Sequence, residues 1–274
     1  MTDIRERLMQ ANNPNLPNVS PGASQLLSAV MSDEIPLNEL GLLIEQYPVV
    51  AARLIAVANS AWSAPEVEIV AIQPACARLG IDVVRTIAIA LTISSPFDPT
   101  QSTNFDIARF WCSGLFMAES ASILSPYFQV SPQLARAAGL IRNLGLLWLT
   151  DEAPSHVDKA LDAVQSEAEA GLNEVLISQC GIGYLEASAY LFRAWNLPDV
   201  FVTAVDPVND PLDPFTRLLQ IAAAFAWALG EGLNANSLDL VGSPEITREV
   251  IYEIYNGQSE HAERTKELAC SLFH

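Results

Sequence analysis

The feature that most constrains the fold of this chain is a long apolar stretch, residues 137–149, with a polar pair at its centre. Every residue in the stretch is apolar or glycine except Arg142 and Asn143. An apolar run of this length is typical of a buried helix. Polar groups inside such a helix cost free energy unless they find partners. The pair therefore marks either a functional site or a satisfied structural network.

Apolar residues at helical spacing recur along the whole chain, and no stretch of useful length shows the two-residue alternation of a strand. Prolines and glycines divide the pattern into short segments. The sequence therefore predicts an all-α protein. The expected helices cover residues 21–30, 37–45, 49–59, 72–79, 83–89 (with Asp82 as its cap), 105–125, 132–149, 156–170, 173–178, 184–195, 218–229 and 245–273, the last range as one or two helices.

One polar segment, residues 94–104, interrupts the helical pattern and contains Pro96 and Pro99. Prolines and short polar residues are typical of connections between elements. We therefore expect a boundary here, between an N-terminal helical lobe (1–100) and a second helical lobe (101–274).

The charge of the chain limits its partners. There are 32 acidic and 14 basic side chains among 274 residues, a formal net charge of −18. Binding to nucleic acid depends on basic groups that displace counterions from phosphates, so no nucleic-acid partner is expected, and an anionic lipid surface is repelled in the same way. The partner is expected to be a protein, a cation or a small molecule, although acidity also serves solubility alone.

Cysteine usage and hydropathy favour a cytoplasmic protein that does not contact membranes. The four cysteines are scattered and form no Cys-x-x-Cys pair, so we expect reduced, buried thiols. The charged first residues do not resemble a signal peptide. The uncharged runs at 86–97 and 218–230 are too short to span a bilayer.

Common catalytic motifs are missing from the sequence. There is no phosphate-binding loop of the Gly-x-x-x-x-Gly-Lys type and no Gly-x-Ser-x-Gly nucleophile elbow. The three histidines, His156, His261 and His274, are far apart and offer little to a Ser-His-Asp site.

Several short motifs follow one another in a recognisable order. They are Asn15-Leu16-Pro17, residues 40–44 before Tyr47-Pro48, Ala58-Asn59-Ser60-Ala61, residues 77–80, Phe110-Trp111, the central stretch, and residues 195–198. Over about residues 15–230 this order resembles the HDOD family, the HD-related output domain of bacterial signalling proteins. The resemblance implies a helical bundle in two lobes, the second with the HD-domain, PDEase-like topology, plus additional C-terminal helices.

The resemblance also shows what the chain lacks. In HD phosphohydrolases the central pair is His-Asp, and imidazoles and carboxylates hold cations that activate water. Here the pair is Arg142-Asn143, and arginine keeps its proton and does not ligate a cation. The other replaced positions are Cys112 and Ser113 for a first histidine, Tyr184 for a further histidine, and Ala223 for about the last aspartate. We therefore expect no metal, no cofactor and no classical phosphohydrolase activity.

Two interpretations of Arg142 remain open. Glu186 could pair with Arg142 as a structural tie between helices, since buried charges are normally paired. Alternatively, Arg142 and Tyr184 could hold a phosphate or nucleotide, because arginine suits bidentate anion recognition. Two interpretations of Asn59 and Ser60 are also open. They could end a helix through local hydrogen bonds, or they could line a groove between the lobes.

The function that follows is a non-catalytic signalling or regulatory module that acts through protein contacts, as monomer or homodimer. Two alternatives belong to other classes: a metal-dependent phosphohydrolase with non-standard ligands, and a sensor of an anionic small molecule at the former metal pocket. Function has to be decided by the site, because one fold supports many activities.

Overall fold

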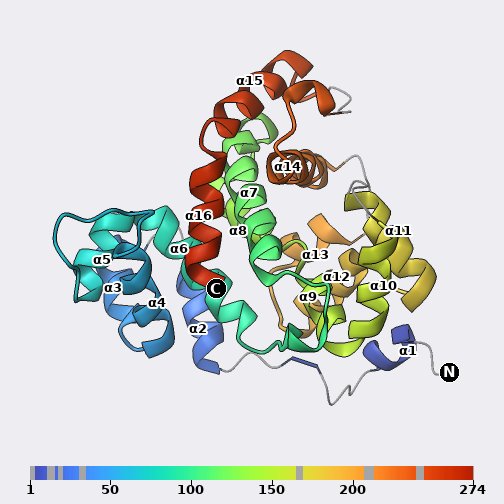
Figure 1. Cartoon of the computed structure of the whole chain (residues 1–274), viewed down its shortest axis with the longest axis horizontal. Helices are drawn as coiled ribbons and strands as arrows, with labels where there is room; N and C mark the ends of the chain where they lie inside the picture. The colour runs from blue at the N-terminus through green and yellow to red at the C-terminus, as the bar shows by residue number, and fades with distance from the viewer. Residues whose placement is uncertain are drawn as a thin grey trace.

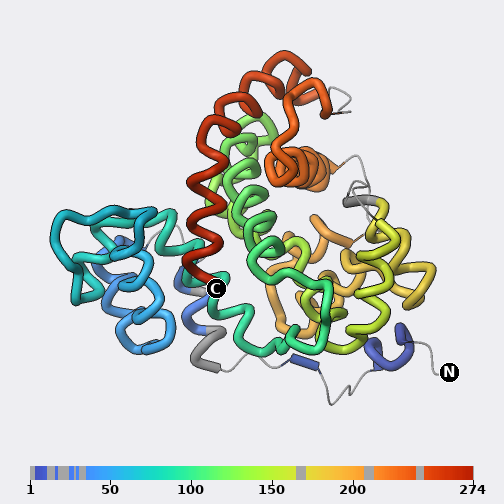
Figure 2. Tube along the Cα trace, in the orientation of Figure 1, coloured from blue at the N-terminus to red at the C-terminus, as the bar shows by residue number. Residues whose placement is uncertain are grey.

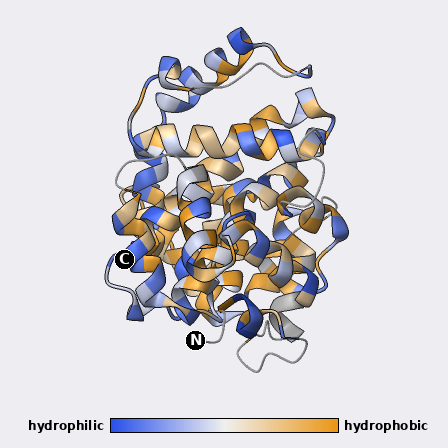
Figure 3. Ribbon diagram, turned by 90° about the vertical axis from the view of Figure 1, so that its right-hand side faces the viewer, coloured by the Kyte–Doolittle hydropathy of each residue, from blue (hydrophilic) through white to orange (hydrophobic). Residues whose placement is uncertain are grey.

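The computed structural model of the chain describes residues 4–10, 16–17, 21–30, 35–164, 169–206, 213–238 and 244–273. Apart from an isolated bridge residue at Ile246, these residues contain helices, turns and loops, and the predicted all-α fold is confirmed. Asn15 and His274 lie outside the described residues. Figure 3 shows hydrophobic residues concentrated in the middle of the helix stack, as burial of apolar surface requires.

The first group of helices lies at one side of the molecule, drawn in blue and teal in Figure 1. α3 and α4 both contact α5, while α6 contacts α2, α4 and α5. Its members are α2 (Pro21–Val30), α3 (Leu37–Ile44), α4 (Pro48–Ala58), α5 (Ile72–Leu79) and α6 (Ile81–Ser94), followed by the short η1 (Pro99–Gln101).

The long helix α7 (Ile107–Leu124) forms the centre of the molecule. It packs against α8 (Pro132–Ile141), α14 (Pro214–Gly230) and α16 (Ala262–Phe273), and Figure 1 shows α16 beside it. Trp111 on α7 is fully buried, and its ring stacks on Phe273 with centroids 5.1 Å apart. The remaining elements near this centre are η2 (Ser125–Phe128), η3 (Ala235–Ser237) and α15 (Arg248–Ser259).

The second group of helices lies on the other side of α7 (Figures 1 and 2). Its members are α9 (Leu144–Glu152), α10 (Pro154–Ala163), α11 (Glu169–Cys180), α12 (Tyr184–Ala194) and α13 (Asp199–Val205). α9 and α12 are in close contact through Gly145. A Cβ atom at Gly145 would collide with the carbonyl oxygen of Tyr184 and lie 2.7 Å from Cβ of Ala187. Glycine is thus required where the two backbones approach.

The prediction of one continuous helix through residues 132–149 is wrong. α8 ends at Ile141, α9 begins at Leu144, and Arg142 and Asn143 form the turn between them. The two halves pack on different helices. A Cβ at Gly139 would lie 2.6 Å from the Met117 carbonyl oxygen of α7, whereas Gly145 packs on α12. The turn lets each half follow its own neighbour, which local apolarity could not predict.

Other differences are local. α6 begins at Ile81, so Asp82 lies in its first turn and does not cap it. Gly80 separates α5 from α6 with φ of +82°, a conformation that glycine tolerates without a steric cost. The sequence missed α1 (Ile4–Leu8) and α13, and α10 ends at Ala163, short of the predicted residue 170.

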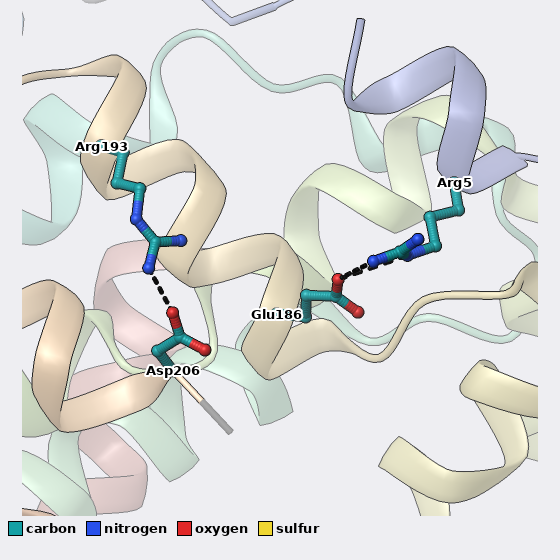
Figure 4. Close-up of polar contacts among 4 residues, drawn as sticks. All are labelled: Arg5, Glu186, Arg193 and Asp206. Carbon is teal, nitrogen blue, oxygen red and sulfur yellow. Dashed lines mark hydrogen bonds and ion pairs between the residues drawn. The ribbon is translucent and has the colours of Figure 1, made fainter. Parts of the chain in front are cut away.

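The N-terminal residues contact the second group of helices. Arg5 on α1 forms an ion pair with Glu186 on α12, at 2.7 Å (Figure 4). Tyr190 donates a hydrogen bond to the Gln10 carbonyl at 3.1 Å, and Trp195 donates to the Pro17 carbonyl at 2.7 Å. The first residues of the chain therefore contact helices of the predicted second lobe, although the predicted boundary near residue 100 assigns them to the N-terminal lobe. The boundary itself stays a prediction.

The cysteines do not all share one environment. Cys76 and Cys180 are buried and Cys112 is half-buried, but Cys270 is exposed, so the predicted burial is wrong for Cys270. Within the described residues, no helix combines the length and the apolar character that crossing a bilayer requires.

Candidate functional site

Three of the positions predicted from the HD resemblance line one cavity of about 440 Å³, which we call the Tyr184 cavity. Ser113 comes from α7, Asn143 from the turn between α8 and α9, and Tyr184 from the first turn of α12. Tyr184 is 1% exposed. Residues 71 positions apart in the chain are thus brought to one place, because α8 packs on α7 and α9, which follows the turn, packs on α12.

A second cavity, of about 370 Å³, adjoins the first and is called the Cys270 cavity. Cys112, Ser113 and Ala223 line it, together with Cys270 from α16. Ser113 is common to both cavities. Except for the Arg142 and Glu186 positions, the replaced ligand positions therefore surround one connected region.

The wall between the two cavities contains residues that the sequence analysis missed. Arg109, Trp227 and Glu231 line both cavities, and Arg109 forms an ion pair with Glu231 that joins α7 to the end of α14. Helical spacing could have found two of them. Arg109 precedes Ser113 by four residues and Trp227 follows Ala223 by four, so each pair shares a helix face.

The structure tests one of the two interpretations of Arg142, the tie to Glu186. Arg142 is 7% exposed, it does not line the Tyr184 cavity, and its Nη1 donates to Oδ1 of Asn143 at 3.1 Å. Among the described residues, Glu186 pairs with Arg5 and not with Arg142 (Figure 4), so the predicted Arg142–Glu186 tie is wrong. Sequence spacing placed Glu186 near the site, but its side chain points to α1.

Asn59 and Ser60 take the structural role. Asn59 Nδ2 donates to the carbonyls of Ile55 (3.0 Å) and Ile69 (2.6 Å), and Asn59 Oδ1 accepts from the Ile69 amide at 2.8 Å. Ser60 Oγ donates to the Val57 carbonyl at 2.7 Å. These bonds end α4 and hold the segment that follows it against the helix.

The side chains at the Tyr184 cavity do not fit the metal centre of an HD phosphohydrolase. Such a centre needs several imidazole or carboxylate ligands, and the replaced positions carry hydroxyls and an amide instead. Within the described ranges, no three His, Cys, Asp or Glu side chains group as metal ligands would. Asp106, Asp162 and Glu231 also line this cavity, but Glu231 is paired with Arg109 and the described carboxylates do not group as a metal site would.

The thiol of Cys112 does not replace the missing ligands. Burial raises its pKa to about 11; Lys266 nearby opposes this, while Cys270, Glu263 and Asp106 add to it. A thiol with such a pKa is protonated at neutral pH, and the thiolate is the form that attacks substrates and binds metals. Cys112 is thus poorly suited to catalysis.

The helical architecture is similar to that of solved HD-type helical folds. A proposed phosphohydrolase from Shewanella amazonensis matches with a TM-score of 0.73 and 19% identity, covering 99% of this chain and 98% of that one. A proposed signal transduction protein from Marinobacter aquaeolei matches with a TM-score of 0.78 and 21% identity, covering 96% of this chain and 61% of that one. An HDOD domain protein of unknown function from Geobacter sulfurreducens matches with a TM-score of 0.69 and 16% identity, covering 99% of each chain.

The model of the HDOD domain matches residues 16–211, and this chain belongs to the HDOD family. The family resemblance seen in the ordered motifs is therefore confirmed. No curated protein matches the chain. At identities of this size the solved structures establish the fold, and activity has to be argued from the site.

Proposed function

We propose that this protein is a non-catalytic regulatory HDOD module that acts through contacts with a protein partner. The observation that carries the proposal is the chemistry of the Tyr184 cavity. Ser113, Asn143 and Tyr184 stand where a phosphohydrolase would need metal ligands, and none of the three side chains is an imidazole or a carboxylate. The fold is kept while the groups that would activate water are replaced.

Exposed apolar side chains support a role in protein binding. Val49, Val67 and Val70 are 75%, 78% and 79% exposed, at the start of α4 and in the segment between α4 and α5. Exposed valines gain free energy when a partner covers them. The match with the Marinobacter protein, which is described as a signal transduction protein, covers 61% of that protein's chain. That pairing of an HDOD-like unit with further chain is consistent with a regulatory module.

The decisive test is metal content together with hydrolysis. The full chain is purified by gel filtration without chelator, analysed for bound metals, and assayed on a generic phosphodiester with added manganese, magnesium or nickel. We expect no stoichiometric metal and no turnover above the buffer rate. Metal-dependent turnover that disappears in Asn143→Ala would overturn the proposal in favour of a hydrolase with non-standard ligands. Turnover that is unchanged in this variant would place the activity outside the Tyr184 cavity and would equally contradict a non-catalytic role.

The protein-binding part has its own test. The Val67→Asp/Val70→Asp variant keeps the helices intact, because both side chains are exposed, and is compared with Ile177→Asp, whose side chain is 48% exposed on α11. We expect the first variant to lose co-purifying partners that the wild type and the control retain. Light scattering after gel filtration also shows whether the partner is a second copy. Equal partner recovery from all three proteins would contradict binding at this segment.

A further inference from the structure

A third cavity, of about 590 Å³, lies where the first group of helices meets α7, α8 and α16. We call it the Trp62 cavity. It has no lining residue in common with the Tyr184 or Cys270 cavities. Its volume is within the range of about 300–1,000 Å³ that is usual for small-molecule sites.

Arginines from three separate parts of the chain line the Trp62 cavity. Arg78 comes from α5, Arg136 from α8 and Arg264 from α16, and His261 lies at the end of the α15–α16 connection. The whole chain has 14 basic side chains against 32 acidic ones. Three arginines at one cavity are therefore a local concentration of positive charge on an acidic protein.

Two of these arginines form no ion pair with a carboxylate among the described residues. Arg78 donates to Ser63 Oγ (3.1 Å) and to the backbone carbonyls of Ser63 and Ala64. Arg264 lies over the ring of Trp62, with its Cζ 5.0 Å from the ring centroid. By contrast, Arg136 pairs with Asp82 at 3.5 Å. No described carboxylate within ion-pair distance neutralises Arg78 or Arg264, so the positive charge of both can attract an anion from outside, although Arg78 also binds the loop.

The remaining acidic group of the cavity does not neutralise them. Glu119 accepts a hydrogen bond from Thr265 Oγ1 at 3.5 Å and forms no ion pair within the described part of the chain. Guanidinium groups bind phosphate through charge-assisted, often bidentate hydrogen bonds. The charge of the cavity therefore favours a phosphorylated ligand.

Trp62 adds a flat aromatic surface to the same cavity. The indole is half-buried beside the guanidinium of Arg264. The bonds from Arg78 hold the loop after Trp62, where Ala64 has a positive φ of 43°. Left-handed conformations are uncommon for residues other than glycine, so Arg78 stabilises a loop geometry that presents the ring. Indole and guanidinium planes both stack on planar rings.

We propose that the Trp62 cavity binds a nucleotide, with its phosphates against the arginines and its base beside Trp62. Arg264, Thr265 and His261 lie outside residues 16–211, the part of the chain that matches the HDOD model. The site is thus completed by this chain's own C-terminal helix. A bound nucleotide would tie the first group of helices to α7 and α16. The proposal is independent of the function proposed above, which concerns the Tyr184 cavity.

The test uses the full chain in low-salt buffer, titrated calorimetrically with ATP or GTP, and separately with inorganic phosphate or adenosine. The informative variant is Arg264→Glu, because Arg264 is exposed and holds no backbone group. Its matched control is Arg248→Glu, an exposed arginine 5.1 Å from the ring of Tyr252 on α15, outside the cavity. Trp62→Leu tests the aromatic surface.

We expect saturable binding of ATP or GTP to the wild type. In Arg264→Glu the affinity should fall by about tenfold or more, as loss of one charge-assisted contact predicts, while Arg248→Glu binds as the wild type does. Trp62→Leu should weaken nucleotides more than phosphate. The proposal is overturned if neither nucleotide binds at millimolar concentration, if both arginine variants lose affinity equally, or if phosphate alone binds as well as ATP.

Discussion

The α9–α12 contact and the Trp62 cavity are stabilised in opposite ways. At the α9–α12 contact, Gly145 lets two backbones approach, and the Gly145 amide donates to Ser188 Oγ at 2.8 Å in a fully buried setting. The Trp62 cavity is formed by long charged side chains, two of which face carbonyls or a ring in place of a carboxylate. Close neutral packing therefore holds α9 against α12, while charged side chains form much of the wall of the Trp62 cavity.

This comparison predicts that substitutions at the α9–α12 contact cost stability and that substitutions at the Trp62 cavity mainly cost binding. The following experiments test it, from the largest expected effect to the smallest.

The largest effect is expected for Gly145→Ala. The added methyl group would collide with the backbone of Tyr184, which cannot move as a side chain can, so the free energy of unfolding should fall by about 3 kcal/mol or the chain should fail to fold. Chemical denaturation followed by circular dichroism measures it. The control is Gly257→Ala on α15, where a Cβ meets nothing within 4 Å, and stability should rise slightly. Equal denaturation midpoints for Gly145→Ala and the wild type would contradict the prediction that the α9–α12 contact determines stability.

A smaller loss is expected for Ser188→Ala. Ser188 Oγ accepts from the Gly145 amide and donates to the Tyr184 carbonyl at 2.9 Å, and Ser188 is fully buried. Leaving a buried amide without a partner costs about 1–3 kcal/mol. The same denaturation experiment on Ser178→Ala, an exposed serine on α11, should show little change. If the two serine variants are equally stable, the buried hydrogen bond between Gly145 and Ser188 does not contribute the expected free energy of unfolding.

The connection between α6 and α7 should respond to pH through Asp158. Burial raises the pKa of Asp158, but hydrogen bonds from Ser102, Thr103 and Asn104 lower it more, so the net pKa lies below its usual value. A carboxyl group whose pKa is lowered by folding contributes stability above its unfolded pKa, and this is lost as the pH falls through the folded value. Asp158→Asn should therefore reduce stability near neutral pH and flatten its decline in acid. Thermal unfolding of each protein across acidic pH measures this, and Glu253→Gln on the exposed face of α15 is the control. If the stability of Asp158→Asn declines in acid as steeply as that of the wild type, Asp158 is not a source of the pH dependence.

The smallest effect on stability is expected for Arg264→Ala at the Trp62 cavity. An exposed cation–π contact contributes about 0.5–1 kcal/mol, so the midpoint should hardly move. Thermal unfolding without ligand measures it, beside Arg248→Ala as the matched contact on Tyr252. A loss as large as that of Gly145→Ala would mean that the Trp62 cavity is a structural element like the α9–α12 contact.

Much of the fold was predictable because helix formation leaves local marks. Apolar spacing and the proline and glycine positions located α3, α4, α5 and α7 to within a few residues. The helix through residues 132–149 was predicted incorrectly, because no local signal separates α8 from α9. Their division depends on Gly139 and Gly145 packing against different helices.

The candidate site was predicted in part for the same reason. Motif order located Ser113, Asn143 and Tyr184, and the structure brings these three to one cavity. Arg142 and Glu186 were misjudged because long charged side chains reach several ångströms from their backbone. Which partner they meet depends on neighbouring helices, as Arg5 on α1 illustrates for Glu186.

By itself, the sequence determined the all-α class and the HDOD family, because residue identity and apolar period are properties of the chain alone. Only the tertiary structure decided that Arg142 and Asn143 sit in a turn, that Arg109 faces Glu231, and that Trp62 meets Arg264. The Arg109–Glu231 and Trp62–Arg264 contacts join residues far apart in the chain, and the turn depends on the different helices on which α8 and α9 pack. They follow from how buried helix faces pack against one another, and no local pattern contains that information.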